Sequence, residues 1–146
     1  AGITLPQDPA EFTTGNVDLT QALCAAIAAS GRKIPVAYTS SSQAGLENPY
    51  GASKRGAEEA LSRLAAEQGI PVYLFRLPNV FGKWARPNYN SAVATFCHNI
   101  ARDLPIQIND PSARINLVYI DDVIASFIAV MEGKLTGDPL VQVQPQ

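Results

Sequence analysis

Several residue types and patterns that mark particular classes of protein are scarce or missing in this chain. Its 146 residues include one histidine, His98, which excludes a zinc site built on a histidine pair and leaves only His98 for a Ser-His-Asp triad. No apolar run approaches the roughly 18 residues that a membrane span needs. Lysine and arginine are scattered, and the net charge is −2, which argues against a nucleic-acid surface. We therefore expect no metal site, no nucleic-acid partner and no membrane partner.

The N-terminus and the two cysteines predict the compartment. The first residues lack the basic and then apolar pattern of a secretory signal, so we expect a cytoplasmic protein. Cys24 and Cys97 lie in separate apolar helical patterns, which is typical of reduced thiols in a core and not of a disulfide.

Apolar periodicity and glycine or proline punctuation predict alternating helices and strands. We expect helices over residues 17–30, 50–68, 90–102 and 121–132, and strands over 34–40, 72–77, 106–109, 117–120 and 140–143. Gly31 and Gly69 mark the ends of the first two helices. The buried faces of these helices are expected to carry Val17, Leu23 and Ile27, and Ala57, Leu61 and Leu64. The alternation predicts an α/β fold with a parallel sheet covered by helices on both faces.

The motif Tyr50-Gly-Ala-Ser-Lys54 is the strongest indication of chemistry. Pro49 disfavours helix at Asn48, so a helix should open at Tyr50 and place Tyr50 and Lys54 on one face. An ammonium near a phenol lowers the phenol pKa, which makes Tyr50 a candidate general acid or base. Alone, such a pair is more often a packed ring and a solvated amine. The hydroxyl run Thr39-Ser-Ser-Ser42, at the end of a strand where α/β sheets bind ligands, favours the catalytic interpretation.

Four sequence segments occur in the same order and at the same spacing as in a known protein family. They are Thr39-Ser-Ser-Ser42, Asn48-Pro-Tyr-Gly-Ala-Ser-Lys54, Phe75-Arg-Leu-Pro-Asn-Val-Phe-Gly82 and Val118-Tyr-Ile-Asp-Asp-Val123. Together they resemble the extended short-chain dehydrogenase/reductase family of nucleotide-sugar epimerases, dehydratases and reductases. The stretch from Val80 to Cys97 is similar to the capsular polysaccharide reductases that act on a UDP-linked 2-acetamido-2,6-dideoxy sugar.

The resemblance implies part of a Rossmann-type doubly wound parallel sheet in a single-domain fragment. Residues 1–82 would carry the second half of the nucleotide-binding sheet, and residues 83–146 would mainly bind substrate. The chain begins without Met and has no Gly-x-Gly-x-x-Gly or Gly-x-x-Gly-x-x-Gly fingerprint to hold a pyrophosphate. We therefore infer the second half of a larger enzyme, and we expect this chain alone to be inactive and to bind dinucleotide weakly.

The resemblance also implies roles for particular residues. Tyr50 would exchange a proton with the sugar carbonyl oxygen, Lys54 would hold the nicotinamide ribose, and Ser41, favoured over Ser42, would orient the reacting oxygen. The expected cofactor is NADPH, with NAD as the alternative. Cofactor contacts are expected from Tyr50, Lys54, Pro78 and Ser40, and substrate contacts from Ser42, Asn79, Asn88, Tyr89, Asn90 and Arg114.

Simpler interpretations of these residues stay open. Turn formation explains Pro78 and Asn79 equally well, a helix cap explains Asn90, and Arg114 is equally well a solvated loop residue. The substrate implied is a UDP-linked 4-keto-6-deoxy N-acetyl sugar in capsular or O-antigen polysaccharide synthesis. Homodimerisation is implied through helices 17–30 and 50–68. The alternatives are an epimerase of the same superfamily and a nucleotide-sugar binding module without activity.

Overall fold

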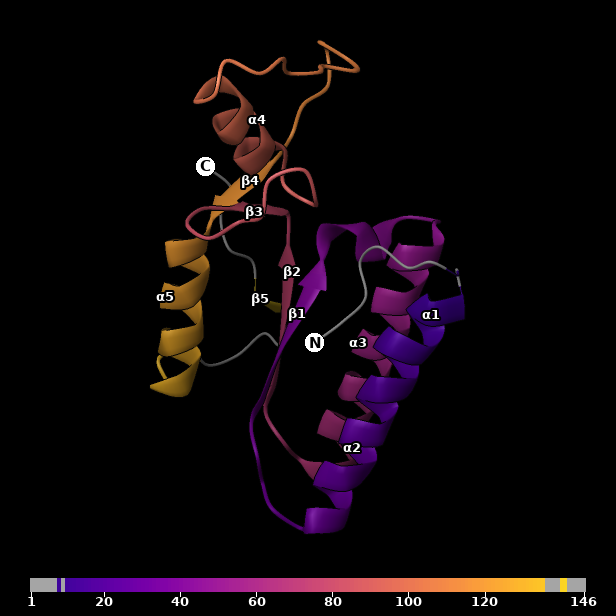
Figure 1. The fold of residues 1–146 in the computed structure, drawn as a ribbon. Coiled ribbons are helices and arrows are strands. Elements are labelled where there is room, and N and C mark those ends of the chain that lie inside the picture. Colours follow the sequence, from indigo (N-terminus) through magenta and orange to yellow (C-terminus); the bar gives the residue numbers. More distant parts are fainter. Residues whose placement is uncertain (1–7, 9, 136–139, 142–146) are drawn as a thin grey trace. The chain divides into compact units, whose positions relative to one another are not determined.

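The computed structural model describes residues 8, 10–135 and 140–141 (Figure 1). They divide into two compact units. Within the described residues, the first unit runs to Arg76 and includes Leu135, Leu140 and Val141, and the second runs from Leu77 to Lys134.

The first unit opens with one long helical stretch. It comprises α1 (Ala10–Phe12), a π-helical turn η1 (Thr13–Asp18) and α2 (Leu19–Ser30), as Figure 1 shows. The Asp8 side chain accepts a hydrogen bond from Ala10 N at 2.9 Å, so the helix begins earlier than the expected residue 17. Gly31 ends it in the left-handed conformation with φ 64°, as its position predicted.

The buried face of this helix agrees only in part with the expected one. Ile27 is buried as expected, whereas Leu23 is 50% exposed and Asn16 and Thr20 are buried in addition. The π-helical turn adds a residue to one turn and so shifts which side chains face inward. Asn16 and Thr20 tolerate burial because both make hydrogen bonds there.

Helix α3 (Pro49–Gln68) ends where the sequence predicts and begins one residue before the expected Tyr50, with Pro49 at its first position. Asn48 is extended, and its side chain accepts a hydrogen bond from Gly51 N at 2.7 Å, which caps the helix. Gly69 ends it with φ 60°. The expected stripe of Ala57, Leu61 and Leu64 is buried.

A three-stranded sheet packs against this helix pair. It consists of β1 (Val36–Ser41), β2 (Val72–Leu77) and β5 (Leu140–Val141), in the order β1-β2-β5. β2 and β5 are parallel, with Leu74 opposite Leu140. Leu61 packs on Val72 and Leu74. Among the described strands, β1 and β5 lie at the two edges of this sheet and β2 lies between them. The expected residues 142–143 of the last strand lie outside the described part of the chain.

The second unit contains a two-stranded parallel sheet and two helices. β3 (Asn79–Phe81) pairs with β4 (Leu117–Tyr119), with Val80 opposite Val118. The helices are α4 (Ala92–Ile100) and α5 (Ile120–Met131). The sequence did not predict β3, and the described strands form two sheets where one was expected.

Two further expectations in this unit are wrong. Residues 106–109 form no strand, and Ile108 is 57% exposed, because no strand in the described part of the chain pairs with them. Helix α4 is shorter than residues 90–102. Its cap is Ser91, whose Oγ accepts a hydrogen bond from Ala94 N at 3.2 Å, and not Asn90.

Candidate active site

The Lys54 ammonium is buried beneath two tyrosine rings in the first unit. Lys54 as a whole residue is 6% exposed. Its Nζ lies 5.1 Å from the Tyr38 ring centroid and 5.8 Å from that of Tyr50. It donates a hydrogen bond to the Thr39 carbonyl oxygen at 3.2 Å. Lys54 and Tyr50 thus lie together on one face of α3, as the motif predicts, and β1 contributes the carbonyl oxygen that binds the ammonium.

Ser41 joins this pair from the end of β1. Its side chain hydrogen-bonds with Tyr50, and its Oγ accepts a hydrogen bond from Gln43 N at 3.2 Å. That second contact caps the 3₁₀ turn η2 (Ser42–Gly45) and fixes the hydroxyl toward the tyrosine. Ser42 is exposed within the turn. The geometry therefore favours Ser41 over Ser42 as the partner of Tyr50.

The electrostatics of Tyr50 differ from the expectation. Burial raises the pKa of the Tyr50 phenol, and the hydrogen bond with Ser41 only partly offsets this. The expected lowering of the pKa by Lys54 is not met, because burial of the ring dominates. Tyr50 therefore carries its proton at neutral pH, which is the form that a general acid requires.

Ser40, the third hydroxyl, is turned into the interior. Its Oγ is buried and meets no partner with full hydrogen-bond geometry among the described residues. The hydroxyl nevertheless lies close enough to Glu58 to lower the pKa of that carboxyl. Ser40 thus faces a different neighbour from Ser41.

A chain of buried hydrogen bonds supports the backbone of Tyr50, and sequence reasoning missed it. Asn16 Nδ2 donates to Ser53 Oγ at 3.0 Å, and Ser53 Oγ donates to the Tyr50 carbonyl oxygen at 2.8 Å. Thr20 Oγ1 donates to the Asn16 carbonyl oxygen at 2.6 Å. The available signal was a pair of polar residues, Asn16 and Thr20, spaced for one helix face.

Tyr38 is a second tyrosine at this site that sequence reasoning did not single out. Burial raises its pKa to about 12, with smaller contributions from Tyr50 and Glu58, while a hydrogen bond with Thr20 opposes them. The Tyr38 phenol is therefore neutral at neutral pH. Its role in the geometry is to cover the Lys54 ammonium.

The expected substrate residues belong to the second unit. Asn79 opens β3, and its backbone N–H donates to the Asn116 carbonyl oxygen at 3.2 Å. Pro78 immediately precedes it and is half-buried. Asn88 has φ 54°, and its N–H donates to Thr95 Oγ1 at 2.9 Å, which fixes the loop that leads into α4.

Other polar groups in this loop are open to solvent. Tyr89 is 55% exposed, and the Arg86 guanidinium carbon lies 5.5 Å from its ring centroid. Asn90 and Arg114 are exposed as well. The loop before α4 therefore offers amide, phenol and guanidinium groups within the second unit.

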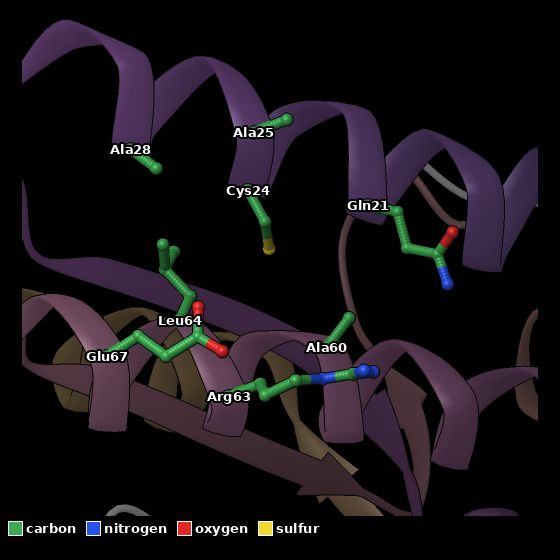
Figure 2. A pocket seen from close by; sticks show the side chains of 8 residues that line it. All are labelled: Gln21, Cys24, Ala25, Ala28, Ala60, Arg63, Leu64 and Glu67. Atoms are coloured by element: carbon green, nitrogen blue, oxygen red, sulfur yellow. The ribbon is translucent and has the colours of Figure 1, made fainter.

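The two cysteines occupy different environments. Cys97 is exposed and lines an open, mostly apolar hollow with His98 and Tyr119, so the expectation of a core residue is wrong for it. Cys24 is half-buried. Figure 2 shows it pointing from α2 toward α3, in a hollow that Ala60, Arg63 and Leu64 also line.

Two kinds of feature are missing from the residues that the structure describes. In this part of the chain, no group of three or more histidine, cysteine, aspartate or glutamate side chains is arranged to hold a metal ion. No helix among the same residues is long and apolar enough to cross a membrane.

Comparisons with known proteins define the class. Residues 5–141 match the model of the NAD dependent epimerase/dehydratase family. The chain belongs to this family, which confirms the family resemblance and the α/β fold class.

Two relatives illustrate the similarity in more detail, one a curated protein and one a solved structure. The chain is 62% identical, over its full length, to the UDP-2-acetamido-2,6-beta-L-arabino-hexul-4-ose reductase of Pseudomonas aeruginosa, and it spans 39% of the length of that protein. Its structure is similar to the capsular polysaccharide assembling protein CapF of Staphylococcus aureus. That match has a TM-score of 0.81 and 41% identity and covers 90% of this chain and 37% of CapF.

A more distant structure supports the fold alone. The UDP-glucuronic acid 4-epimerase of Bacillus cereus, solved in complex with NAD, matches with a TM-score of 0.81 at 23% identity. The match covers 98% of this chain and 50% of the epimerase. This match shows a shared arrangement of helices and strands, which by itself does not define an activity.

Proposed function

We propose that the protein carrying this chain is a nucleotide-sugar reductase. It would use NAD(P)H to reduce the keto group of a UDP-linked 4-keto-6-deoxy N-acetyl sugar during capsular or O-antigen polysaccharide synthesis. The observation that carries the proposal is a protonated, half-buried Tyr50 hydrogen-bonded with Ser41 above a buried Lys54. The 62% identity to a reductase of this kind gives the substrate class.

Tyr50 acts as the general acid in this proposal. Its raised pKa keeps the phenol protonated, so a proton is available when the carbonyl oxygen becomes an alcohol oxygen. Ser41 lies beside the same hydroxyl and donates a hydrogen bond to the developing oxyanion. In the reverse direction Tyr50 takes the proton back.

Lys54 fits a nicotinamide ribose. An ammonium has three donors, and within the described residues one of them bonds to the Thr39 carbonyl, which leaves donors for ribose hydroxyls. A bound nicotinamide cofactor supplies the hydride. Ser40 and Pro78 remain proposed cofactor contacts, and the preference for NADPH over NAD is part of the proposal.

The proposed substrate contacts are polar side chains. Ser42, which is exposed, is one of them. The others are Asn79, Asn88, Tyr89, Asn90 and Arg114. Exposed amide and guanidinium groups suit the oxygens of a sugar diphosphate, and the Arg86 side chain over Tyr89 keeps positive charge in the same loop.

A homodimer and a cytoplasmic location complete the proposal. The outward face of α2 exposes Leu19 and Leu23, each 50% exposed, together with several alanines. An apolar helix face of this kind suits association with a second copy. The cytoplasmic location is supported by Cys24 and Cys97, which are both free thiols, as is typical of proteins in a reducing compartment.

The test is turnover by the full gene product. We expect NADPH oxidation with a UDP-4-keto-6-deoxy N-acetyl sugar, and we expect Tyr50→Phe to abolish it while the nucleotide-sugar affinity measured by calorimetry stays unchanged. Tyr73→Phe, which changes a half-buried tyrosine on β2, is the matched control and should remain active. Full turnover by Tyr50→Phe, or interconversion of sugars without net NADPH oxidation, would overturn the proposal.

A further inference from the structure

Glu58 is a buried carboxylate one helical turn beyond Lys54, and the reaction proposed above does not use it. Glu58 is 5% exposed and Lys54 is 6% exposed. Residues at this spacing lie on one face of a helix, so both side chains point from α3 toward the sheet. On α3 and β2, the elements that carry Glu58 and Arg76, Leu61 and Phe75 are fully buried.

Arg76 on β2 holds this carboxylate with a two-point contact. Arg76 Nε lies 2.9 Å from Glu58 Oε1, and Arg76 Nη2 lies 2.6 Å from Glu58 Oε2. A bidentate pair fixes the direction of the carboxylate as well as its charge. The Ser40 hydroxyl faces it from β1, so two strands and one helix determine where Glu58 lies.

Such an arrangement is costly for stability alone. The Arg76 side chain is 38% exposed and keeps contact with water, whereas the Glu58 side chain is only 6% exposed. Removing the Glu58 carboxylate from water carries a desolvation penalty, and an apolar residue of similar volume often stabilises a core equally well or better. The neighbour that gains from a fixed negative charge is Lys54. Its ammonium is buried under the rings of Tyr38 and Tyr50, with the Thr39 carbonyl as its hydrogen-bond partner.

We propose that Glu58, fixed by Arg76, is a positioning residue that keeps Lys54 charged and in place beneath Tyr50. The role of Lys54 in catalysis rests on the proposed function, whereas its charge state does not. Glu58 contacts neither Tyr50 nor a reacting atom in this role, and it acts through the ammonium.

Lys54 and Glu58 each favour the charged form of the other. Burial lowers the pKa of the Lys54 ammonium, and the Glu58 charge opposes this effect. Burial alone would raise the pKa of the Glu58 carboxyl, but the hydrogen bonds from Arg76, the nearby Ser40 hydroxyl and the charges of Arg76 and Lys54 outweigh it and lower that pKa. Glu58 is therefore ionised at neutral pH and supplies a full negative charge.

The experiment compares Glu58→Gln with Glu59→Gln in the full gene product. Glu59 is the next residue on the helix and is exposed, so its substitution removes the same charge from the solvent side. The Lys54 side chain is titrated by NMR in ligand-free protein carrying ¹³Cε-labelled lysine, with Lys54→Arg identifying the resonance. We expect Lys54 to lose its proton at lower pH in Glu58→Gln than in the wild type, and at the wild-type pH in Glu59→Gln.

Turnover provides the second readout. Loss of a correctly placed ammonium should lower kcat of Glu58→Gln by roughly 10- to 100-fold with little change in KM for the nucleotide sugar. A purely structural role would not move the Lys54 titration. If the proposed function were wrong, the titration would still shift while reductase turnover would be absent from the wild type as well.

An unchanged Lys54 titration in folded Glu58→Gln would overturn the inference. If Glu58→Gln does not fold, the same titration is made on Glu58→Asp. This variant keeps the negative charge, but its side chain is shorter by one methylene group, so the carboxylate lies in a different position. A smaller fall in the same direction is then expected. Identical titration of Lys54 in Glu58→Asp and in the wild type would overturn the inference equally.

Discussion

The side-chain oxygen of Asn48 accepts a hydrogen bond from the Gly51 amide at 2.7 Å, and Tyr50 lies between these two residues. The contact caps α3 and at the same time fixes the backbone on both sides of the proposed general acid. The same hydrogen bond therefore contributes both to the stability of the helix start and to the placement of Tyr50.

Asn48→Ala and Asn48→Asp should therefore differ in stability and in kcat. Loss of the cap should lower the free energy of unfolding by about 1 kcal/mol and reduce kcat, because Tyr50 loses its fixed backbone. The aspartate keeps an acceptor oxygen and should retain most of both. Thermal unfolding and steady-state kinetics check this, and equal behaviour of the two variants would contradict it.

Gly51 has a second constraint, since a Cβ there would lie 2.2 Å from the Gln43 carbonyl oxygen. Gly51→Ala must push α3 away from the η2 turn, at a cost of at least about 2 kcal/mol. At Gly45 in the same turn, a Cβ would meet nothing within 4 Å. Gly45→Ala should therefore change stability by less than about 0.5 kcal/mol. Similar unfolding midpoints for the two variants would argue against the close approach.

Local signals made α3 and β2 predictable from sequence. Asn48 and Pro49 mark the start of α3 and Gly69 marks its end, and the six apolar-rich residues of β2 match residues 72–77 as expected. Each of these signals depends on neighbours along the chain. The spacing of Tyr50 and Lys54 is a local signal of the same kind, and it was sufficient to predict that both lie on one helix face.

Features that depend on distant residues were not predictable in this way. Asn16 is buried because Ser53, on another helix, accepts its hydrogen bond. β3 forms because it pairs with β4, whereas residues 106–109 have the alternation of a strand but pair with none of the described strands. The Glu58–Arg76 pair likewise joins two elements whose pairing no local pattern indicates.

Ser41→Ala should move the alkaline limb of kcat/KM to higher pH. The hydrogen bond with Ser41 opposes the rise of the Tyr50 pKa that burial causes, so its removal lets that pKa rise further. Reduction requires protonated Tyr50 and is lost as pH rises through this pKa. Ser42→Ala, at an exposed position, should leave the limb unchanged. A limb that moves to lower pH in Ser41→Ala would contradict the assignment.

Leu23→Glu should weaken the proposed homodimer. It places a charge on the exposed apolar face of α2, where a second copy would exclude water. Ile108→Glu adds the same charge at a similarly exposed position in the second unit, 57% against 50% for Leu23, and should leave association unchanged. Sedimentation of the full gene product tests both variants, and a strictly monomeric wild type would refute the dimer.

The proposed catalytic groups are contributed by one short stretch of chain, from Ser41 at the end of β1 to Lys54 in α3. Contacts of small sequence separation cost little loop-closure entropy, and they form early in folding. β5, by contrast, reaches β2 from the far end of the chain, with Val141 beside Phe75. We therefore expect the geometry around Tyr50 to be established in the folding nucleus, and hydrogen exchange to protect α3 before the last strand joins the sheet.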